Sequence, residues 1–348
     1  MQCWSGELWS MMIVCSDCKR YKNIAFTCKS RFCNSCSKAS SDKRLMNLIR
    51  RWPQWLQYYH LIFTVPKELR DFFKRHRNAL KIMSLVASNA VQYFFKKKYK
   101  CTPWIVNVIH TFWAKLNWNT HIHMVLSAWW ITRYNTFRTI WFIPYAWILA
   151  SWKWFLLKEL NNWIYKHLSW EKYKEEYNFL QSISNLKNKF NDTKSWFIHF
   201  SQKADSFQKV LSYIGRYLKR PVIAQSRIKK YDGENIIFEY VDKYDGEKKD
   251  IHCSAQEFIW SLIQHIPQKH FKMVSYAGIF CNCVKRKYLK IIEQFIWKQE
   301  LQIKIAKSYR WRMIQYLGID IAKCSCWWIF KKHSISVPWY KTIYFNSS

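Results

Sequence analysis

The chain has 348 residues, with 57 Lys and Arg against 22 Asp and Glu, which leaves a formal net charge of +35. Half of the residues are apolar, which excludes an intrinsically disordered polycation and predicts a folded, strongly basic protein of about two domains. Such a charge predicts a polyanionic partner, above all nucleic acid. No signal-peptide pattern opens the chain, so we expect a cytoplasmic protein whose 12 cysteines are metal ligands or free thiols rather than disulfides.

The first half of the chain alternates helical patterns with β-rich runs. A basic amphipathic stretch over 40–55 predicts a connecting helix, and residues 59–65 predict a strand. Residues 67–100 read as two helices, the second of which ends in a basic cluster. Two further β-rich runs, 105–112 and 121–127, are separated by a stretch short enough for a hairpin, so we expect them to pair antiparallel.

The second half predicts a long helical region over 144–190, a strand over 196–201 and an amphipathic helix over 206–219. A three-stranded meander over 227–231, 236–242 and 248–253 follows, and a capped helix over 255–266 closes it. The most apolar window, 141–157, is too short to span a bilayer and contains Lys153, so we expect a buried amphipathic helix there and no membrane partner. The order of elements predicts an α+β fold, in which helices cover an antiparallel sheet.

Two cysteine pairs near the N-terminus predict a zinc site. Cys15 and Cys18, like Cys33 and Cys36, have the two-residue spacing that lets two thiolates bind one tetrahedral Zn²⁺. Two more cysteines of this segment, Cys3 and Cys28, could replace one of the four or flank the site. The alternative is that all six are ordinary buried thiols.

The triplet His121-Ile122-His123 predicts a second metal site. In a strand, residues i and i+2 point to the same face, so both imidazoles can reach one divalent cation. By itself the triplet is more often incidental, but two polar rings on a strand covered by helices are costly unless they have partners.

Tyr213 and Tyr217 are four residues apart in the expected 206–219 helix, so their phenols share one helix face. Three basic residues flank them: Arg216, Lys219 and Arg220. Without other evidence these tyrosines read as amphipathic residues at the edge of the core. Next to a metal-polarised phosphate, however, a tyrosine can act as a nucleophile that forms a covalent phosphotyrosine.

Four motifs follow one another along the chain: TCKSRFCNSC, LIFTVPKELRDFF, LNWNTHIHMVLS and YIGRYLKRPVIAQSRIKKYDG. With these motifs in this order, the chain resembles the two-tyrosine rolling-circle transposases of the insertion-sequence 91 type, in the HUH endonuclease superfamily. The resemblance runs from about Cys3 to Tyr276. It implies an HUH-type antiparallel sheet flanked by helices and preceded by a small module that holds a structural Zn²⁺. It also implies the partners, which are DNA, mainly single-stranded element ends, and the host replication machinery.

The resemblance further implies that His121 and His123 hold a catalytic Mg²⁺ or Mn²⁺ and that Tyr213 and Tyr217 nick single-stranded DNA. The product would be a 5′-phosphotyrosine and a free 3′-hydroxyl that primes strand displacement. A third metal ligand is expected, and His110 and Gln208 are the candidates. The residues expected to contact DNA are Arg216, Lys219, Arg220, Lys203 and Arg227, although each could equally belong to a solvated basic face.

These patterns divide the chain into a zinc-binding module over 1–40, a connecting helix over 41–57, an HUH-type catalytic domain over 58–280 and a basic C-terminal extension over 281–348. The catalytic domain includes a β-meander plus helix at 226–266. Two other functions remain open: a decayed transposase that binds DNA without nicking it, and a plasmid-type replication initiator. Both histidines and both tyrosines of the nicking motif are retained, which favours the transposase.

Glycine is scarce and tryptophan abundant, at 6 and 22 residues, whereas a chain of this length should carry about 24 glycines. Several tryptophans stand where the resembled family has glycine, including Trp104, Trp113 and the pair Trp129 and Trp130, and we expect them at turns with positive φ. The sequence Cys324-x-Cys326-Trp-Trp similarly resembles a Cys-x-Cys-Gly-Gly turn, but with only two cysteines we expect no second zinc site there.

This pattern suggests that many of the tryptophans are encoded by UGA codons that the source organism reads as glycine. We therefore expect mass spectrometry of the native protein to find glycine at positions 129 and 130. Tryptophan in those peptides, or UGG codons at those positions, would rule out the recoding.

Overall fold

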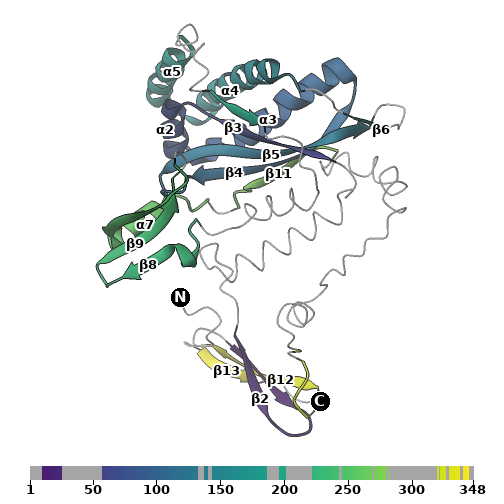
Figure 1. The fold of residues 1–348 in the computed structure, drawn as a ribbon, viewed down its shortest axis with the longest axis vertical. Helices are drawn as coiled ribbons and strands as arrows, with labels where there is room; N and C mark the ends of the chain where they lie inside the picture. The colour runs from purple at the N-terminus through teal and green to yellow at the C-terminus, as the bar shows by residue number, and fades with distance from the viewer. Residues whose placement is uncertain are drawn as a thin grey trace. The chain divides into compact units, whose positions relative to one another are not determined.

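The computed structural model contains two compact units, whose elements are shown in Figure 1. The described residues are 10–25, 57–131, 137–139, 143–185, 196–200, 222–242, 245–268, 270–279, 281, 320, 322–326, 329–337 and 340–344. The smaller unit contains the described residues before 26 and after 319, and the larger unit contains those from 57 to 281.

The larger unit is built on an antiparallel sheet whose strand order is β11-β4-β5-β3-β7, with β6 added to β5. Its strands are β3 (Tyr58–Thr64), β4 (Thr102–Phe112), β5 (Trp118–Ile131), β6 (Phe137–Thr139), β7 (Ile198–Phe200) and β11 (Val274–Gly278). The predicted hairpin over 105–127 is confirmed, and its two strands extend well beyond the predicted bounds. The antiparallel sheet with helices confirms the α+β class.

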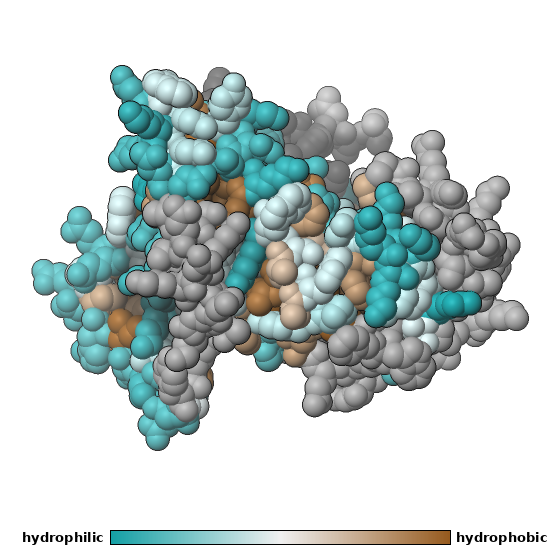
Figure 2. Space-filling view, turned by 90° about the horizontal axis from the view of Figure 1, so that it is seen from above, coloured by the Kyte–Doolittle hydropathy of each residue, from teal (hydrophilic) through white to brown (hydrophobic). Residues whose placement is uncertain are grey.

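Four α-helices lie over one face of this sheet (Figure 1). They are α2 (Lys67–Arg75), α3 (Leu80–Phe94), α4 (Tyr145–His167) and α5 (Trp170–Asn185). The predicted helical region 144–190 is therefore two helices, separated where Leu168 adopts an extended backbone. The surface drawn in colour in Figure 2 is mostly hydrophilic, with apolar residues in small separate areas. Within the described segments, no helix is long and apolar enough to cross a membrane.

The two faces of the sheet differ because side chains alternate along each strand. Ile122, Met124 and Leu126 of β5 join the main apolar core together with residues of α3 and α4. Asn107 of β4 faces the same helices, and its amide donates to the Ser84 carbonyl oxygen at 3.0 Å and to Ser88 Oγ at 2.7 Å, which fixes α3 on the sheet. The intervening residues of β5, including His121 and His123, therefore point to the opposite face.

A separate three-stranded meander and one helix follow the central elements. The strands are β8 (Ile228–Tyr231), β9 (Asn235–Val241) and β10 (Lys248–Ser254), in the order β10-β9-β8, as predicted from the two Asp-Gly turns. The helix α7 (Ala255–Ile263) begins with the predicted capping box of Ser254 and Glu257 and ends three residues earlier than predicted.

The smaller unit is a four-stranded antiparallel sheet made from two distant parts of the chain. Its strands are β1 (Ser10–Cys15), β2 (Tyr21–Ala25), β12 (Phe330–Val337) and β13 (Tyr340–Tyr344), in the order β13-β12-β1-β2. The sequence predicted neither β1 nor its pairing with β12, which runs from Ser10 opposite Ser336 to Cys15 opposite Phe330.

Four of the tryptophans that were expected at positive φ do not have a positive φ. Trp104, Trp129 and Trp130 are strand residues of β4 and β5, and neither they nor Trp113 is among the described residues with positive φ. Trp104 and Trp130 are buried in the sheet. The expectation of strained turns at these four positions was therefore wrong, and the recoding hypothesis rests on composition and on the resemblance alone.

Gly278, at the end of β11, is one position that requires glycine. Its φ is +62°, and a Cβ placed there would lie 1.9 Å from the Pro103 carbonyl oxygen, whose own partner is the Ile279 N–H at 3.1 Å. Gly233 in the first Asp-Gly turn has a φ of +105° but open space around the position of a Cβ. Alanine at Gly233 would therefore add backbone strain alone, whereas alanine at Gly278 would add backbone strain and a steric clash.

We expect Gly278→Ala to destabilise the larger unit by about 2–4 kcal/mol, because the clash adds to the strain of positive φ. Gly233→Ala, the matched control, should cost only about 1 kcal/mol. Denaturant titration followed by tryptophan fluorescence measures both. Equal losses in the two variants would contradict the close approach of β11 and β4 at Gly278.

Candidate metal centres

Three histidines lie together on the sheet face opposite the helices. His110 of β4 pairs with His121 of β5 in the strand register, and His123 follows on the same face. The ring centroids are 4.4 Å apart for His110 and His123, 4.8 Å for His121 and His123, and 5.3 Å for His110 and His121. One ring nitrogen of each histidine lies within 4.8 Å of the other two, and all three side chains are buried. Adjacent strands thus bring His110, a candidate third ligand, to the predicted pair.

The hydrogen bonds of His121 fix its tautomer. Its Nδ1 lies 2.9 Å from the Asn119 carbonyl oxygen, which can only accept, so Nδ1 carries the proton. A neutral imidazole with its proton on Nδ1 has its lone pair on Nε2, a nitrogen that can bind a cation. A backbone carbonyl that holds the far nitrogen of a histidine is the usual support of a metal-binding imidazole.

His60 of β3 supports His123 in the same way. His60 Nε2 lies 3.0 Å from His123 Nδ1, and the two rings stack with centroids 5.3 Å apart and planes 7° from parallel. Burial, with a smaller contribution from the charge of His199, lowers the pKa of His60 to about 4, so His60 is neutral at pH 7. When His123 Nδ1–H donates to His60 Nε2, the lone pair of His123 is on Nε2, where it can bind a cation.

The donor set fits a divalent transition metal. One ring nitrogen of each histidine lies within 4.8 Å of the other two on a buried face, so one cation can bind all three. Imidazole nitrogen suits transition metals, whereas Mg²⁺ prefers oxygen ligands. Of the two cations expected from the sequence, Mn²⁺ therefore fits His110, His121 and His123 better than Mg²⁺ does.

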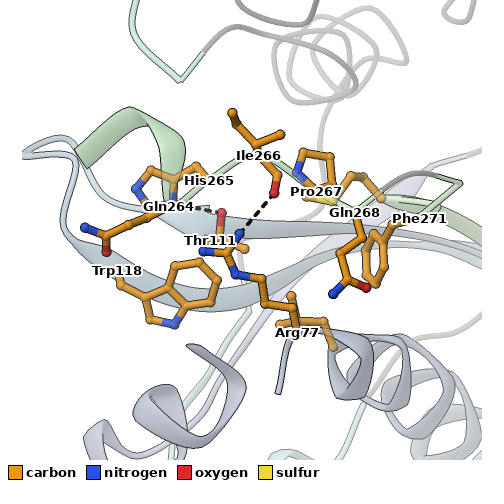
Figure 3. Close-up of a pocket in the computed structure, with 11 residues that line it drawn as sticks. Arg77, Thr111, Trp118, Gln264, His265, Ile266, Pro267, Gln268 and Phe271 are labelled. Carbon is orange, nitrogen blue, oxygen red and sulfur yellow. Dashed lines mark hydrogen bonds between the residues drawn. The ribbon is translucent and has the colours of Figure 1, made fainter. Parts of the chain in front are cut away.

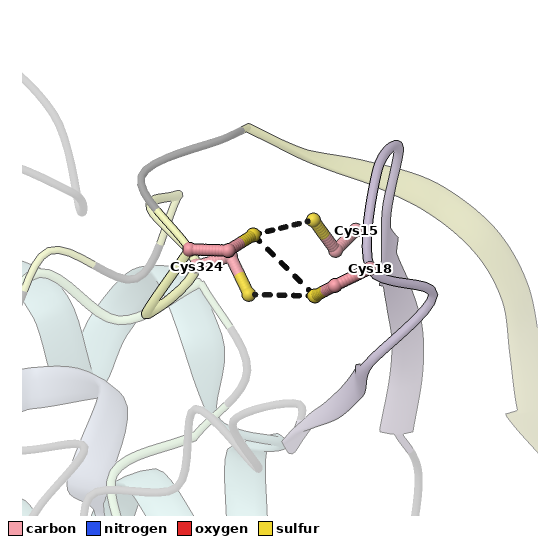
Figure 4. A group of neighbouring side chains, drawn as sticks. Cys15, Cys18 and Cys324 are labelled. Carbon is pink, nitrogen blue, oxygen red and sulfur yellow. Dashed lines mark hydrogen bonds between the residues drawn. The ribbon is translucent and has the colours of Figure 1, made fainter.

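Four cysteines form a second group, in the smaller unit (Figure 4). Cys15 ends β1, Cys18 lies in the turn that follows, and Cys324 and Cys326 lie in the turn before β12. The Sγ atoms are 3.4 Å apart for Cys15 and Cys326, 3.5 Å for Cys18 and Cys324, and 3.4 Å for Cys18 and Cys326. All four are free thiols. The structure thus places Cys15 and Cys18 beside a pair for which the sequence predicted no zinc site.

Two sequence comparisons cover most of the chain. A model of the family described as "Putative transposase" matches residues 105–287, and a model described as "Transposase zinc-binding domain" matches residues 1–65. The first match alone spans more than half of the chain and includes all three clustered histidines. The chain belongs to the insertion-sequence 91 type of transposases, with an N-terminal zinc-binding domain.

Two curated relatives agree with this assignment. The transposase for insertion sequence element IS801 of Pseudomonas savastanoi pv. phaseolicola is 28% identical over 311 residues, which cover 88% of this chain and 74% of the relative. The putative transposase y4qJ of Sinorhizobium fredii is 21% identical over 351 aligned positions, which cover 92% of this chain and 83% of the relative. No solved structure matches the chain.

Several predicted site residues of the transposase lie outside the described residues. These are Cys3, Cys28, Cys33 and Cys36 of the zinc prediction, Tyr213, Tyr217 and Gln208 of the nicking site, and Lys203, Arg216, Lys219 and Arg220 of the expected DNA contacts. Their roles remain predictions. His60, Cys324 and Cys326 are the residues that the sequence analysis did not assign to a site.

Arg227, a predicted DNA contact, makes hydrogen bonds within the transposase. Its Nε donates to the Glu239 carbonyl oxygen and its Nη2 to the Ala114 carbonyl oxygen, both at 2.6 Å. The guanidinium carbon also lies 5.9 Å from the centroid of the Phe238 ring, within the limit of about 6 Å for a cation–π contact. These contacts join the meander to the loop after β4, which is a structural use of this side chain.

A pocket of the transposase beside α7 is lined by residues with partners inside the fold (Figure 3). His265 Nε2 lies 2.9 Å from the Leu116 carbonyl oxygen, so it carries the proton, and Nδ1 accepts from Thr111 Oγ at 3.1 Å. Arg77 donates to the Ile266 carbonyl oxygen at 3.2 Å and lies over the Trp118 ring. His265 thereby holds Leu116, whose φ is +64°, and we assign this pocket a structural role.

We expect the full-length transposase to bind Mn²⁺ at the histidine cluster and His60→Leu to weaken that binding about 10-fold, because His123 loses the partner of its Nδ1. His60→Gln, whose amide oxygen can accept the same hydrogen bond, should restore most of the affinity. Isothermal titration with Mn²⁺ measures this, and His252→Ala, an exposed histidine of β10, is the matched control. Equal affinity in the Leu and Gln variants would refute a positioning role for His60.

Proposed function

We propose that this transposase nicks and rejoins single-stranded DNA through 5′-phosphotyrosine intermediates and so drives rolling-circle transposition. The observation that carries the proposal is the cluster of His110, His121 and His123, with ring nitrogens within 4.8 Å of one another on one face of the sheet. The transposase family and the IS801 relative supply the reaction class, and the cluster supplies a place for the cation that such chemistry uses.

His110, His121 and His123 are the residues that would hold the cation. A divalent cation bound there would polarise a phosphate oxygen and offset the charge that develops during displacement. The carbonyl oxygen of Asn119 and the ring of His60 hold two of the three imidazoles by their Nδ1 atoms, so the lone pairs of these imidazoles are oriented before any ligand arrives. Orientation that exists in advance lowers the cost of reaching the transition state.

Tyr213 and Tyr217 are the proposed nucleophiles. The phenolic oxygen of one tyrosine forms a bond to the scissile phosphorus and loses its proton, while the bond from phosphorus to the 3′ oxygen breaks and that oxygen takes up a proton. One phosphodiester replaces another, so the step needs no energy source. The four-residue spacing gives two phenols on one helix face, which allows two covalent links to form in succession.

The charge of the chain supports binding to the DNA strand. A net charge of +35 provides sequence-independent attraction to phosphates that falls steeply with salt. Four basic residues near the tyrosines in sequence, Lys203, Arg216, Lys219 and Arg220, are the proposed local contacts. A free 3′-hydroxyl left by the nick would be the primer for the host replication machinery, which the proposal includes as a partner.

We expect Tyr213→Phe or Tyr217→Phe alone to block one stage of strand transfer, and the double variant to form no covalent adduct. The change removes the attacking oxygen and keeps the ring. The assay is incubation of labelled single-stranded DNA carrying an element end with protein and Mn²⁺, followed by a denaturing gel. Tyr165→Phe, an exposed tyrosine of α4, is the matched control and should nick as the unaltered chain does.

A companion variant tests the histidine cluster. His121→Ala should abolish adduct formation while binding to the same DNA stays within a few-fold, because most of the affinity comes from charge. Adduct formation in the double Phe variant, or full cleavage in EDTA, would overturn the proposal. No adduct from the unaltered chain with intact DNA binding would instead favour a decayed transposase that only binds DNA.

A further inference from the structure

The two turns that carry the four cysteines face each other across the β1–β12 pair. Cys15 lies opposite Phe330 in the register, so the turn after β1 comes beside the turn before β12. Further hydrogen bonds join the same turns: Ser16 Oγ donates to the Ile329 carbonyl oxygen at 3.4 Å, and the Arg20 guanidinium bonds to Ser325 Oγ. The closeness of the thiols thus has support from the backbone and from neighbouring side chains.

The sulfur positions match those of a tetrahedral zinc site. A Zn–S bond of about 2.3 Å places neighbouring sulfurs about 3.8 Å apart, and the three measured Sγ–Sγ distances are 3.4, 3.5 and 3.4 Å. Zinc binds cysteine in its thiolate form, and all four thiols lie close enough together to share one ion.

The described side chains of the smaller unit include few buried apolar ones. In its four strands and turns these are Ile13, Cys15 and Cys324. Small domains commonly gain stability from a disulfide or a metal. Four thiolates on one Zn²⁺ would provide that stability and join segments more than 300 residues apart.

We propose that Cys15, Cys18, Cys324 and Cys326 bind one structural Zn²⁺, so that this zinc site is made by both ends of the chain. The match to the zinc-binding domain covers residues 1–65 and contains only two of these ligands. The N-terminal segment therefore holds half of the site, and β12 brings the other half. Four thiolates complete a tetrahedral set, so the proposed ligand set does not include Cys33 and Cys36, the partners expected from spacing.

Zinc content of the purified full-length chain tests the ligand set. Cys324→Ser/Cys326→Ser should lower bound zinc by one equivalent relative to the unaltered chain, and Cys15→Ser/Cys18→Ser should lower it by the same amount. Combining both pairs should cause no further loss, because they share one ion. Cys101→Ser/Cys253→Ser, which changes two free cysteines of the larger unit, should leave the zinc content unchanged.

A second measurement uses the unaltered chain and so avoids variants that do not fold. Thiols that bind zinc react slowly with maleimide, and we expect Cys15, Cys18, Cys324 and Cys326 to become reactive together when a chelator is added, as mapped by mass spectrometry. Rapid labelling of Cys324 and Cys326 in the zinc-loaded chain would overturn the proposal. So would a full zinc content after Cys324→Ser/Cys326→Ser, which would return Cys33 and Cys36 to the site. Neither outcome depends on DNA nicking.

Discussion

The antiparallel pairing of β4 with β5 is the interaction on which the larger unit depends. Its register sets Ile109 opposite Ile122 and His110 opposite His121, so one face of the hairpin is apolar and the other carries imidazoles. Because side chains alternate, a slip of one residue would move the imidazoles into the helix-covered core and the isoleucines out of it. Pairing of β4 with β5 in this register therefore buries the apolar face and assembles the histidine cluster at the same time.

The two candidate metal centres use the backbone differently. At the histidine cluster, long strands set the ligands, and the backbone carbonyl of Asn119 and the ring of His60 orient two of them. At the cysteine group, the thiols lie in two turns that the Ser16–Ile329 and Arg20–Ser325 hydrogen bonds join, with Lys19 at a φ of +58° beside Cys18. The first site is thus set by strands, whereas the proposed zinc would add a further link between two turns.

Local features of the fold were predictable from the sequence. The Asp-Gly turns, the capping box at Ser254 and the β-rich runs of the hairpin each depend on residues close together in the chain. The alternation rule likewise places His121 and His123 on one face. The contribution of His60 depends on the register of β3 against β5, and no pattern within β3 reveals it. The pairing of β1 with β12 was not predictable, because it joins segments more than 300 residues apart and Cys324-x-Cys326 lacks the usual spacing of zinc ligands.

The position of β1 between β2 and β12 has a consequence during synthesis. Strand β2 is synthesised directly after β1. Strand β12 is synthesised more than 300 residues later, after roughly 15–65 s at ordinary rates of elongation. During that time the edge of β1 that will bind β12 is unpaired, and an exposed strand edge can pair with a strand of another chain. The sheet can close only when translation has reached β12, so a chain that is terminated or cleaved before β12 lacks it.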